Sequence, residues 1–160
     1  MSYVSEVNER LKYELGANVN LLNKSNQRLM QSYELCSIIL KKEKYEENDY
    51  YIFDSLTSRF ARVSDIYSQK SLRLIFELLK EYPKTFIDKA NLAEKIELID
   101  SAEELNEIRL LRNDIAHEYE ELDLQKLINR VMNQTPVMDK IIKSTVAYIE
   151  KQFEIKTTAG

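Results

Sequence analysis

The side chains best suited to chemistry lie in one short stretch, residues 110–119, which contains the only histidine of the chain, His117. Arg112, Asn113 and Tyr119 lie beside it. A guanidinium offers a fixed fork of N–H donors that matches phosphate oxygens, and an imidazole exchanges protons near neutral pH. RNA supplies its own nucleophile, the 2′-hydroxyl. A proton donor or acceptor and a cation beside the phosphate are therefore sufficient for a transesterification.

The spacing of these residues leaves two interpretations open. On an ideal helix Asn113 and His117 share a face, whereas Arg112 and His117 lie about 140° apart. We expect Arg112 and His117 to converge only if the helix loosens near His117 or if a second subunit completes the site. Each residue also suits a structural role, such as packing for a lone histidine or a surface ion pair for an arginine. Spacing alone does not decide between the two.

The composition excludes several other kinds of site. The 160 residues include 2 glycines, 2 prolines and 1 cysteine. Neither of the glycine-rich phosphate loops, GxxxxGK[ST] or GxGxxG, is present, so side chains must handle any phosphate. One histidine and one cysteine argue against a zinc site within a single chain, and we expect neither a metal nor a cofactor. Cys36 has apolar neighbours and is predicted to be a small core residue.

The scarcity of glycine and proline indicates long helices, and apolar residues recur at three- and four-residue spacing. The pattern predicts helices over 2–42, from about 53 to the Glu81-Tyr82-Pro83 sequence, over 88–99, from Ser101, and over 122–153. Ser101 and Glu104 match a capping box. Thr135-Pro136 predicts a break in the last helix, or at least a kink. The expected fold is an all-α, up-down antiparallel bundle of four to five helices.

We expect one domain over residues 1–154, followed by a flexible C-terminal tail over residues 155–160. No apolar run approaches the length of about 18 residues that a membrane span requires, and no signal peptide is apparent. The expected location is therefore the cytoplasm, without a membrane partner.

The distribution of charge makes RNA binding a local question. The net charge is −4, from 23 basic and 27 acidic residues, which is not typical of a nonspecific nucleic-acid binder. Residues 94–123 hold 11 acidic side chains against Lys95, Arg109 and Arg112. We hypothesise that Arg59 or Arg62, on the second predicted helix, lines the same cleft and contacts RNA phosphates. The alternative is that these arginines form ion pairs with the acidic helix.

The pattern Arg112-x4-His117-x-Tyr119, with Asn113 directly after the arginine, resembles the R-N-x-x-x-H-x-Y signature of the HEPN superfamily (higher eukaryotes and prokaryotes nucleotide-binding). Within that superfamily the chain is similar to the toxin of the HEPN/minimal-nucleotidyltransferase (HepT/MntA-like) toxin–antitoxin type. The order of the predicted helices is also similar over most of the chain. The resemblance is sharpest over residues 112–119.

The resemblance implies a HEPN-like bundle that acts as a metal-independent endoribonuclease toxin. Two copies of the motif would meet in one cleft of a homodimer. His117 would be the general acid/base, Arg112 would hold the scissile phosphate of the RNA substrate, and Asn113 would orient His117 or the substrate. Tyr119 resembles the tyrosine that a cognate nucleotidyltransferase antitoxin modifies with AMP.

Two other functions remain open at this point. One is a non-catalytic HEPN-fold binding subunit of a nucleotidyltransferase. The other is a helical-bundle interaction protein in which the motif is accidental.

Overall fold

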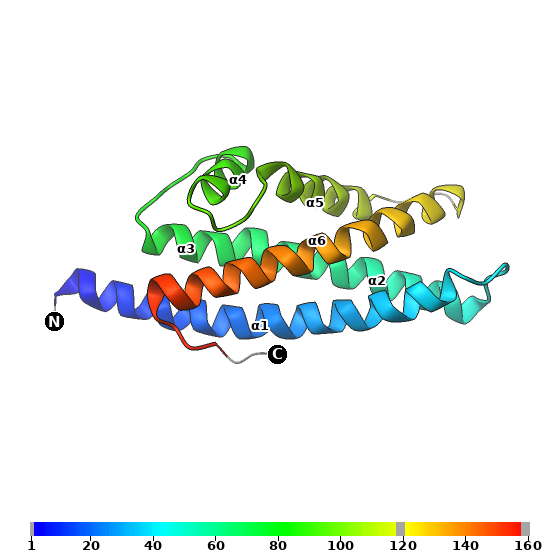
Figure 1. Ribbon diagram of the computed structural model, residues 1–160, viewed down its shortest axis with the longest axis horizontal. Coiled ribbons are helices and arrows are strands. Elements are labelled where there is room, and N and C mark those ends of the chain that lie inside the picture. The colour runs from blue at the N-terminus through cyan, green and yellow to red at the C-terminus, as the bar shows by residue number, and fades with distance from the viewer. Residues whose placement is uncertain (1, 118–120, 158–160) are drawn as a thin grey trace.

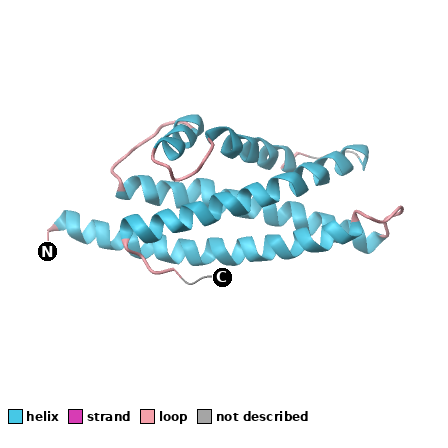
Figure 2. Ribbon diagram, in the orientation of Figure 1, coloured by secondary structure: helices cyan, strands magenta, loops and turns pink. Residues whose placement is uncertain are grey.

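The computed structural model describes residues 2–117 and 121–157, and the secondary structure of this part is helical, without strands. The elements in chain order are α1 (Tyr3–Ile39), α2 (Glu47–Asp65), the π-helix η1 (Ile66–Ser71), α3 (Leu72–Leu78), α4 (Phe86–Lys95), α5 (Ala102–Ile115) and α6 (Glu121–Phe153). α2, η1 and α3 follow one another without a loop, and Figure 2 shows loops before α2, before α4 and between α4 and α5. The predicted all-α class is confirmed.

The long elements run antiparallel to one another along the length of the molecule (Figure 1). The chain goes out along α1, returns along α2, η1 and α3, goes out again along α5 and returns along α6. Helix α1 packs against α2 and α6, while α5 packs against α2 and α6 from the other side. This is the predicted up-down bundle, with the short α4 placed against α5.

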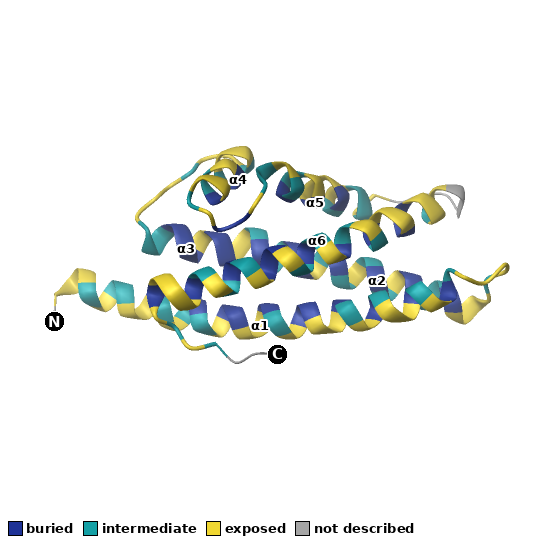
Figure 3. Cartoon of the chain, viewed as in Figure 1, coloured by how far each residue is buried: buried dark blue, intermediate teal, exposed yellow. Residues whose placement is uncertain are grey.

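The core is built from the apolar stripes that the sequence predicts (Figure 3). On α1, Leu15, Leu22, Leu29 and Cys36 recur at seven-residue intervals and are fully buried. Removal of such side chains from water is the main source of stability. Burial also raises the pKa of the Cys36 thiol to about 11, so this cysteine is an uncharged core residue as predicted.

The π-helix η1 is the feature of the fold that the apolar pattern does not predict. The sequence indicates one regular helix through this region, but residues 66–71 form a wider turn. Polar contacts fix it from two sides. The Ser71 hydroxyl donates to Oδ1 of Asn18 on α1 (2.6 Å), and the hydroxyls of Tyr67 and of Thr145 on α6 are hydrogen-bonded at 2.8 Å.

The predicted break at Thr135-Pro136 is wrong, because α6 runs through both residues as one helix. The weaker alternative, a kink at this point, stays a prediction. Pro136 lacks an N–H and lies inside the helix on an exposed position. Thr135 is fully buried, and its hydroxyl donates to the Val131 carbonyl at 2.7 Å. Thr135 therefore bonds back into the preceding turn instead of capping a new helix.

Side-chain caps set the starts of α4 and α5. Thr85 and Asp88 form a reciprocal capping box, which starts α4 at Phe86, two residues earlier than predicted. The Ser101 hydroxyl accepts from the Glu104 N–H at 3.2 Å, as predicted. The Glu104 carboxylate, however, binds Lys140 on α6 at 2.9 Å, so it ties α5 to α6 rather than completing a box.

Helix α6 ends at Phe153, and the residues that follow leave the helix. Ile155 is half-buried and lies against Gly16 of α1, with its Cγ2 3.6 Å from where a Cβ on that glycine would lie. Thr157 is hydrogen-bonded to Glu150. Gly16 itself lies within α1. The division into a domain over 1–154 and a flexible tail over 155–160 stays a prediction.

A stability test follows from the buried bond between Tyr67 and Thr145. We expect Tyr67→Phe to lower the free energy of unfolding by about 1–2 kcal/mol, because it leaves the Thr145 hydroxyl buried without that partner. Urea denaturation measures the change. The double variant Tyr67→Phe/Thr145→Val should lose less than the sum of the two single changes, since it removes both polar groups. Tyr13→Phe, at a tyrosine that is 81% exposed, is the matched control and should be neutral. Additive losses would contradict this account.

Candidate functional site

Arg112 is held by a two-point ion pair with Asp65. Its Nε donates to Oδ1 of Asp65 at 2.8 Å and its Nη2 donates to Oδ2 at 2.9 Å. The side chains retain 29% and 35% exposure, so the pair lies at the surface of the α2–α5 contact. The hydrogen bonds to Asp65 raise the pKa of Arg112 above its ordinary value, and the guanidinium stays charged. Three of its five N–H donors remain for a ligand.

Asp65 is the site residue that the sequence analysis did not identify. It is the last residue of α2 and directly precedes η1. Asp65 is one of four acidic residues on α2, and its place in the sequence carries no signal by itself. The π-helix, which often accompanies functional sites, is visible only once the polar contacts of Tyr67 and Ser71 are known.

His117 lies just beyond the end of α5. The helix ends at Ile115, and the N–H groups of Ala116 and His117 donate to the carbonyls of Asn113 and Asp114, three residues back. The helix therefore tightens to a three-residue hydrogen-bond spacing before His117, which is a departure from the regular helix of the kind expected there. Asn113 and His117 are both exposed. Among the described residues, no hydrogen bond joins Arg112, Asn113 or His117 to one another, and Tyr119 lies outside the described residues.

Part of the acidic charge around this site is neutralised by other elements. Asp114 binds Arg130 of α6 at 2.6 Å, and Glu104 binds Lys140. The bond to Glu104 also raises the pKa of Lys140. The net charge of the segment therefore overstates the repulsion that an anion would meet at Arg112.

Arg59 and Arg62 do not pair with the acidic segment within the described part of the chain. The Nη1 of Arg59 donates to the Ser32 hydroxyl at 2.7 Å and to the Arg28 carbonyl at 2.9 Å, both on α1. Arg62 is exposed, one turn before Asp65. With Ser25 and Arg28, these two arginines line a hollow of about 270 Å³ between α1 and α2.

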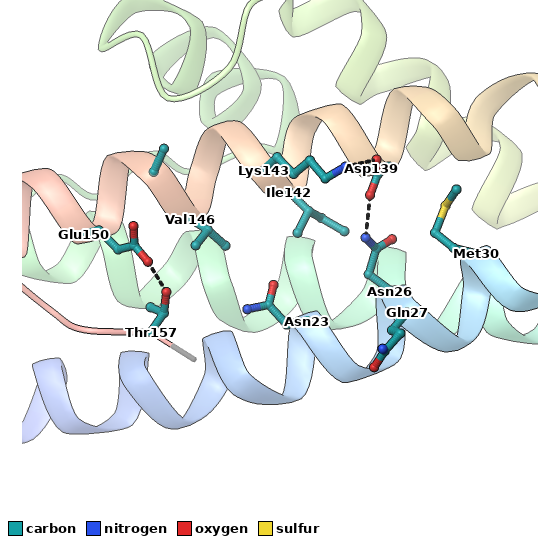
Figure 4. A pocket seen from close by; sticks show the side chains of 11 residues that line it. Asn23, Asn26, Gln27, Met30, Asp139, Ile142, Lys143, Val146, Glu150 and Thr157 are labelled. Atoms are coloured by element: carbon teal, nitrogen blue, oxygen red, sulfur yellow. Dashed lines mark hydrogen bonds and ion pairs between the residues drawn. The ribbon is translucent and has the colours of Figure 1, made fainter. Parts of the chain in front are cut away.

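A larger groove lies elsewhere, between α1 and α6, and contains none of the predicted site residues (Figure 4). It encloses about 420 Å³. Asp139 bridges it, accepting from Asn26 at 2.8 Å and pairing with Lys143 at 2.8 Å. Its apolar wall includes Ile142 and Val146. Two of the charged groups that line it, Asp139 and Lys143, are thus paired with each other.

Neither a metal-binding cluster nor a membrane-spanning helix is found within the described residues. No group of three histidine, cysteine, aspartate or glutamate side chains there is arranged to hold a metal ion. No helix there is long and apolar enough to cross a membrane.

The family of the chain is indicated by a family model described as ribonuclease HepT-like, which matches residues 67–145. Residues 67–145 belong to the HepT-like family. The HepT-like segment begins within η1 and contains Arg112, Asn113 and His117. The match confirms the family predicted from the motif at residues 112–119. No curated protein and no solved structure matches the chain. Asp65 and the arginine-lined hollow lie before the HepT-like segment.

The bond between Asp65 and Arg112 is testable by a double-mutant cycle with Asp65→Asn and Arg112→Gln. We expect a coupling of about 1 kcal/mol in urea unfolding, near the upper end for partly exposed pairs because the contact has two points. The matched control is Arg73→Gln with Glu77→Gln, a one-point pair on α3, for which we expect about 0.3–0.5 kcal/mol. Equal coupling in the two cycles would show that the second contact adds no stability.

Proposed function

We propose that this protein is an endoribonuclease toxin that cleaves RNA without a metal ion, through Arg112 and His117. The observation that carries the proposal is the two-point bond from Asp65, which fixes the Arg112 guanidinium near the end of the helix that leads to His117. The HepT-like match over these residues supports ribonuclease activity.

The proposed reaction is attack of a 2′-hydroxyl on the adjacent phosphodiester. A neutral imidazole of His117 takes the 2′-proton as the O2′–P bond forms, and the P–O5′ bond breaks. An imidazolium returns a proton to the departing 5′-oxygen. The products are a 2′,3′-cyclic phosphate and a 5′-hydroxyl. Arg112 stabilises the charge that develops on the non-bridging oxygens, and Asn113 orients His117 or the substrate.

A homodimer supplies the two proton-transfer groups that this scheme requires. The chain contains one histidine. An imidazole that takes the proton from the 2′-oxygen is poorly placed to protonate the 5′-oxygen, because the two oxygens lie on opposite sides of the phosphorus. Two copies of the motif in one cleft would provide a base and an acid. The exposure of Asn113 and His117 supports this arrangement, since both are accessible to a second subunit.

We propose further that the cognate partner is a minimal nucleotidyltransferase antitoxin that transfers AMP to Tyr119. The hydroxyl would attack the α-phosphorus of ATP, with pyrophosphate as the leaving group. The added phosphodiester places bulk and negative charge two residues from His117, where it would repel the RNA backbone.

The first test is cleavage of several RNAs by purified protein in the presence of EDTA. We expect His117→Ala to lower the rate by about 10²–10⁴-fold and Arg112→Ala by about 10²–10³-fold. Arg73→Ala, which removes an exposed arginine on α3, is the matched control and should cleave as wild type does. Sedimentation of the same samples should give a dimer.

Two outcomes would overturn the enzyme assignment. Wild type that cleaves no RNA would favour a non-catalytic binding subunit of a nucleotidyltransferase. Equal cleavage by His117→Ala would indicate a contaminating nuclease or a different site.

The second test addresses Tyr119. With the nucleotidyltransferase and ATP, we expect wild type to gain the mass of AMP and to lose cleavage activity, because the modification blocks the RNA path. Tyr119→Phe should gain no AMP and should stay active in the same mixture. Tyr51→Phe, at an exposed tyrosine on α2, should behave as wild type. Modification of Tyr119→Phe at the wild-type level would place the accepting residue elsewhere.

A further inference from the structure

The hollow between α1 and α2 is a cationic site in an acidic protein. Ser25 and Arg28 line it from α1, and Arg59 and Arg62 line it from α2. Residues 20–33 of α1 and 55–64 of α2 contain no aspartate or glutamate, and their charged residues are Lys24 and these three arginines. The concentration of positive charge is therefore local, despite a net charge of −4.

The arginines of the hollow are not neutralised by carboxylates. Among the described residues, Arg28, Arg59 and Arg62 form no ion pair, and the nearest acid on α2, Asp65, is bound by Arg112. Arg59 uses only Nη1 in its bonds to Ser32 and to the Arg28 carbonyl. These bonds hold the guanidinium against α1, and its Nε and Nη2 remain for a ligand. Arg59 is thus oriented before any ligand arrives.

The lining favours a phosphate over a protein partner. Three guanidiniums and a hydroxyl line the hollow, and all four side chains are able to donate hydrogen bonds. Protein interfaces have an apolar centre, often with aromatic anchors, and no apolar side chain lines this hollow. Arginine forks match the geometry of phosphate oxygens.

Helix α2 carries two arginines of the hollow and also Asp65, the partner of Arg112. Arg59, Arg62 and Asp65 follow at three-residue steps, which places them along one side of the helix over a rise of about 9 Å. Arg59 is at the α1 end of this row, and Asp65 binds Arg112 of α5 at the other end. Arg62 lies between them and is exposed.

We propose that Ser25, Arg28, Arg59 and Arg62 form a phosphate-binding subsite that holds a backbone phosphate of the RNA substrate beside the phosphate bound by Arg112. The subsite rests on the proposed ribonuclease function. It adds Ser25 and Arg28 of α1 to the predicted phosphate contacts of Arg59 and Arg62. RNA would then contact the arginines of the hollow and Arg112, although the chain as a whole is acidic.

The test is binding of a single-stranded oligonucleotide with 2′-O-methyl groups, which lacks the nucleophile and stays intact. Each phosphate contact contributes about −0.7 to the slope of log K against log salt for single strands. We expect Arg28→Gln/Arg62→Gln to reduce the magnitude of this slope by about 0.7, because the subsite holds one phosphate. Arg10→Gln/Arg73→Gln, which removes the same charge from two surface pairs, should leave the slope unchanged. Neither pair of changes removes a contact of the core, so circular dichroism should show folded protein throughout.

Failure of the subsite is distinguishable from failure of the ribonuclease assignment. An equal slope for the two double variants would overturn the subsite, even if wild type cleaves RNA. A smaller slope of log K against log salt in Arg28→Gln/Arg62→Gln alone would support the subsite, even if wild type binds RNA without cleaving it. A third arm measures binding of polyglutamate. If the change weakens polyglutamate binding but not RNA binding, the hollow is a docking site for an acidic protein, and the proposal is wrong.

Discussion

The two-point bond between Asp65 and Arg112 is the interaction on which the candidate site depends. It joins α5 to the end of α2, at the residue where the regular helix gives way to η1. A guanidinium on a four-bond stem has many rotamers, and an unrestrained one would lose that freedom on binding a phosphate. The carboxylate removes much of this cost beforehand. It does so while leaving the charge of the guanidinium partly exposed, where an anion can reach it.

Much of the fold was predictable from the sequence, because helices with one apolar face leave a strong periodic signal. The stripe on α1 from Leu15 to Cys36, the cap at Ser101 and the antiparallel order are all readable from residue types and spacing. The errors have a common physical origin. Both involve side-chain hydrogen bonds. The π-helix at residues 66–71, which the sequence does not predict, is held by the hydroxyls of Tyr67 and Ser71. At Thr135 the hydroxyl bonds to the preceding turn instead of capping a new helix. The bonds of Tyr67 and Ser71 join residues 78 and 53 apart, which a local pattern does not record.

The candidate site was predictable only in its chemistry. The motif predicts Arg112, Asn113 and His117 as site residues, and the HepT-like match spans their positions. The partner of Arg112 is 47 residues earlier in the chain. The contact of Arg59 with α1 joins residues 27 and 31 apart. Pairings of this kind are set by how the helices pack, which no single-helix pattern records. The same packing shows why an acidic chain can hold a cationic hollow: α6 neutralises acids on α5, while the arginines between α1 and α2 have no carboxylate beside them.

The wider turn of η1 also sets the direction in which the side chains of α3 point relative to those of α2. Each residue of a regular helix advances the side chains by about 100°, so a segment that accommodates an additional residue shifts every position after it by that amount. In this chain the shift lets α2 present Asp65 to α5 while α3 still buries Leu72, Leu74 and Ile75. A uniform helix would orient the side chains of α3 differently, by about 100° for each residue of difference. The π-helix therefore allows one continuous helical segment both to pack α3 into the core and to present Asp65 of α2 at the surface site.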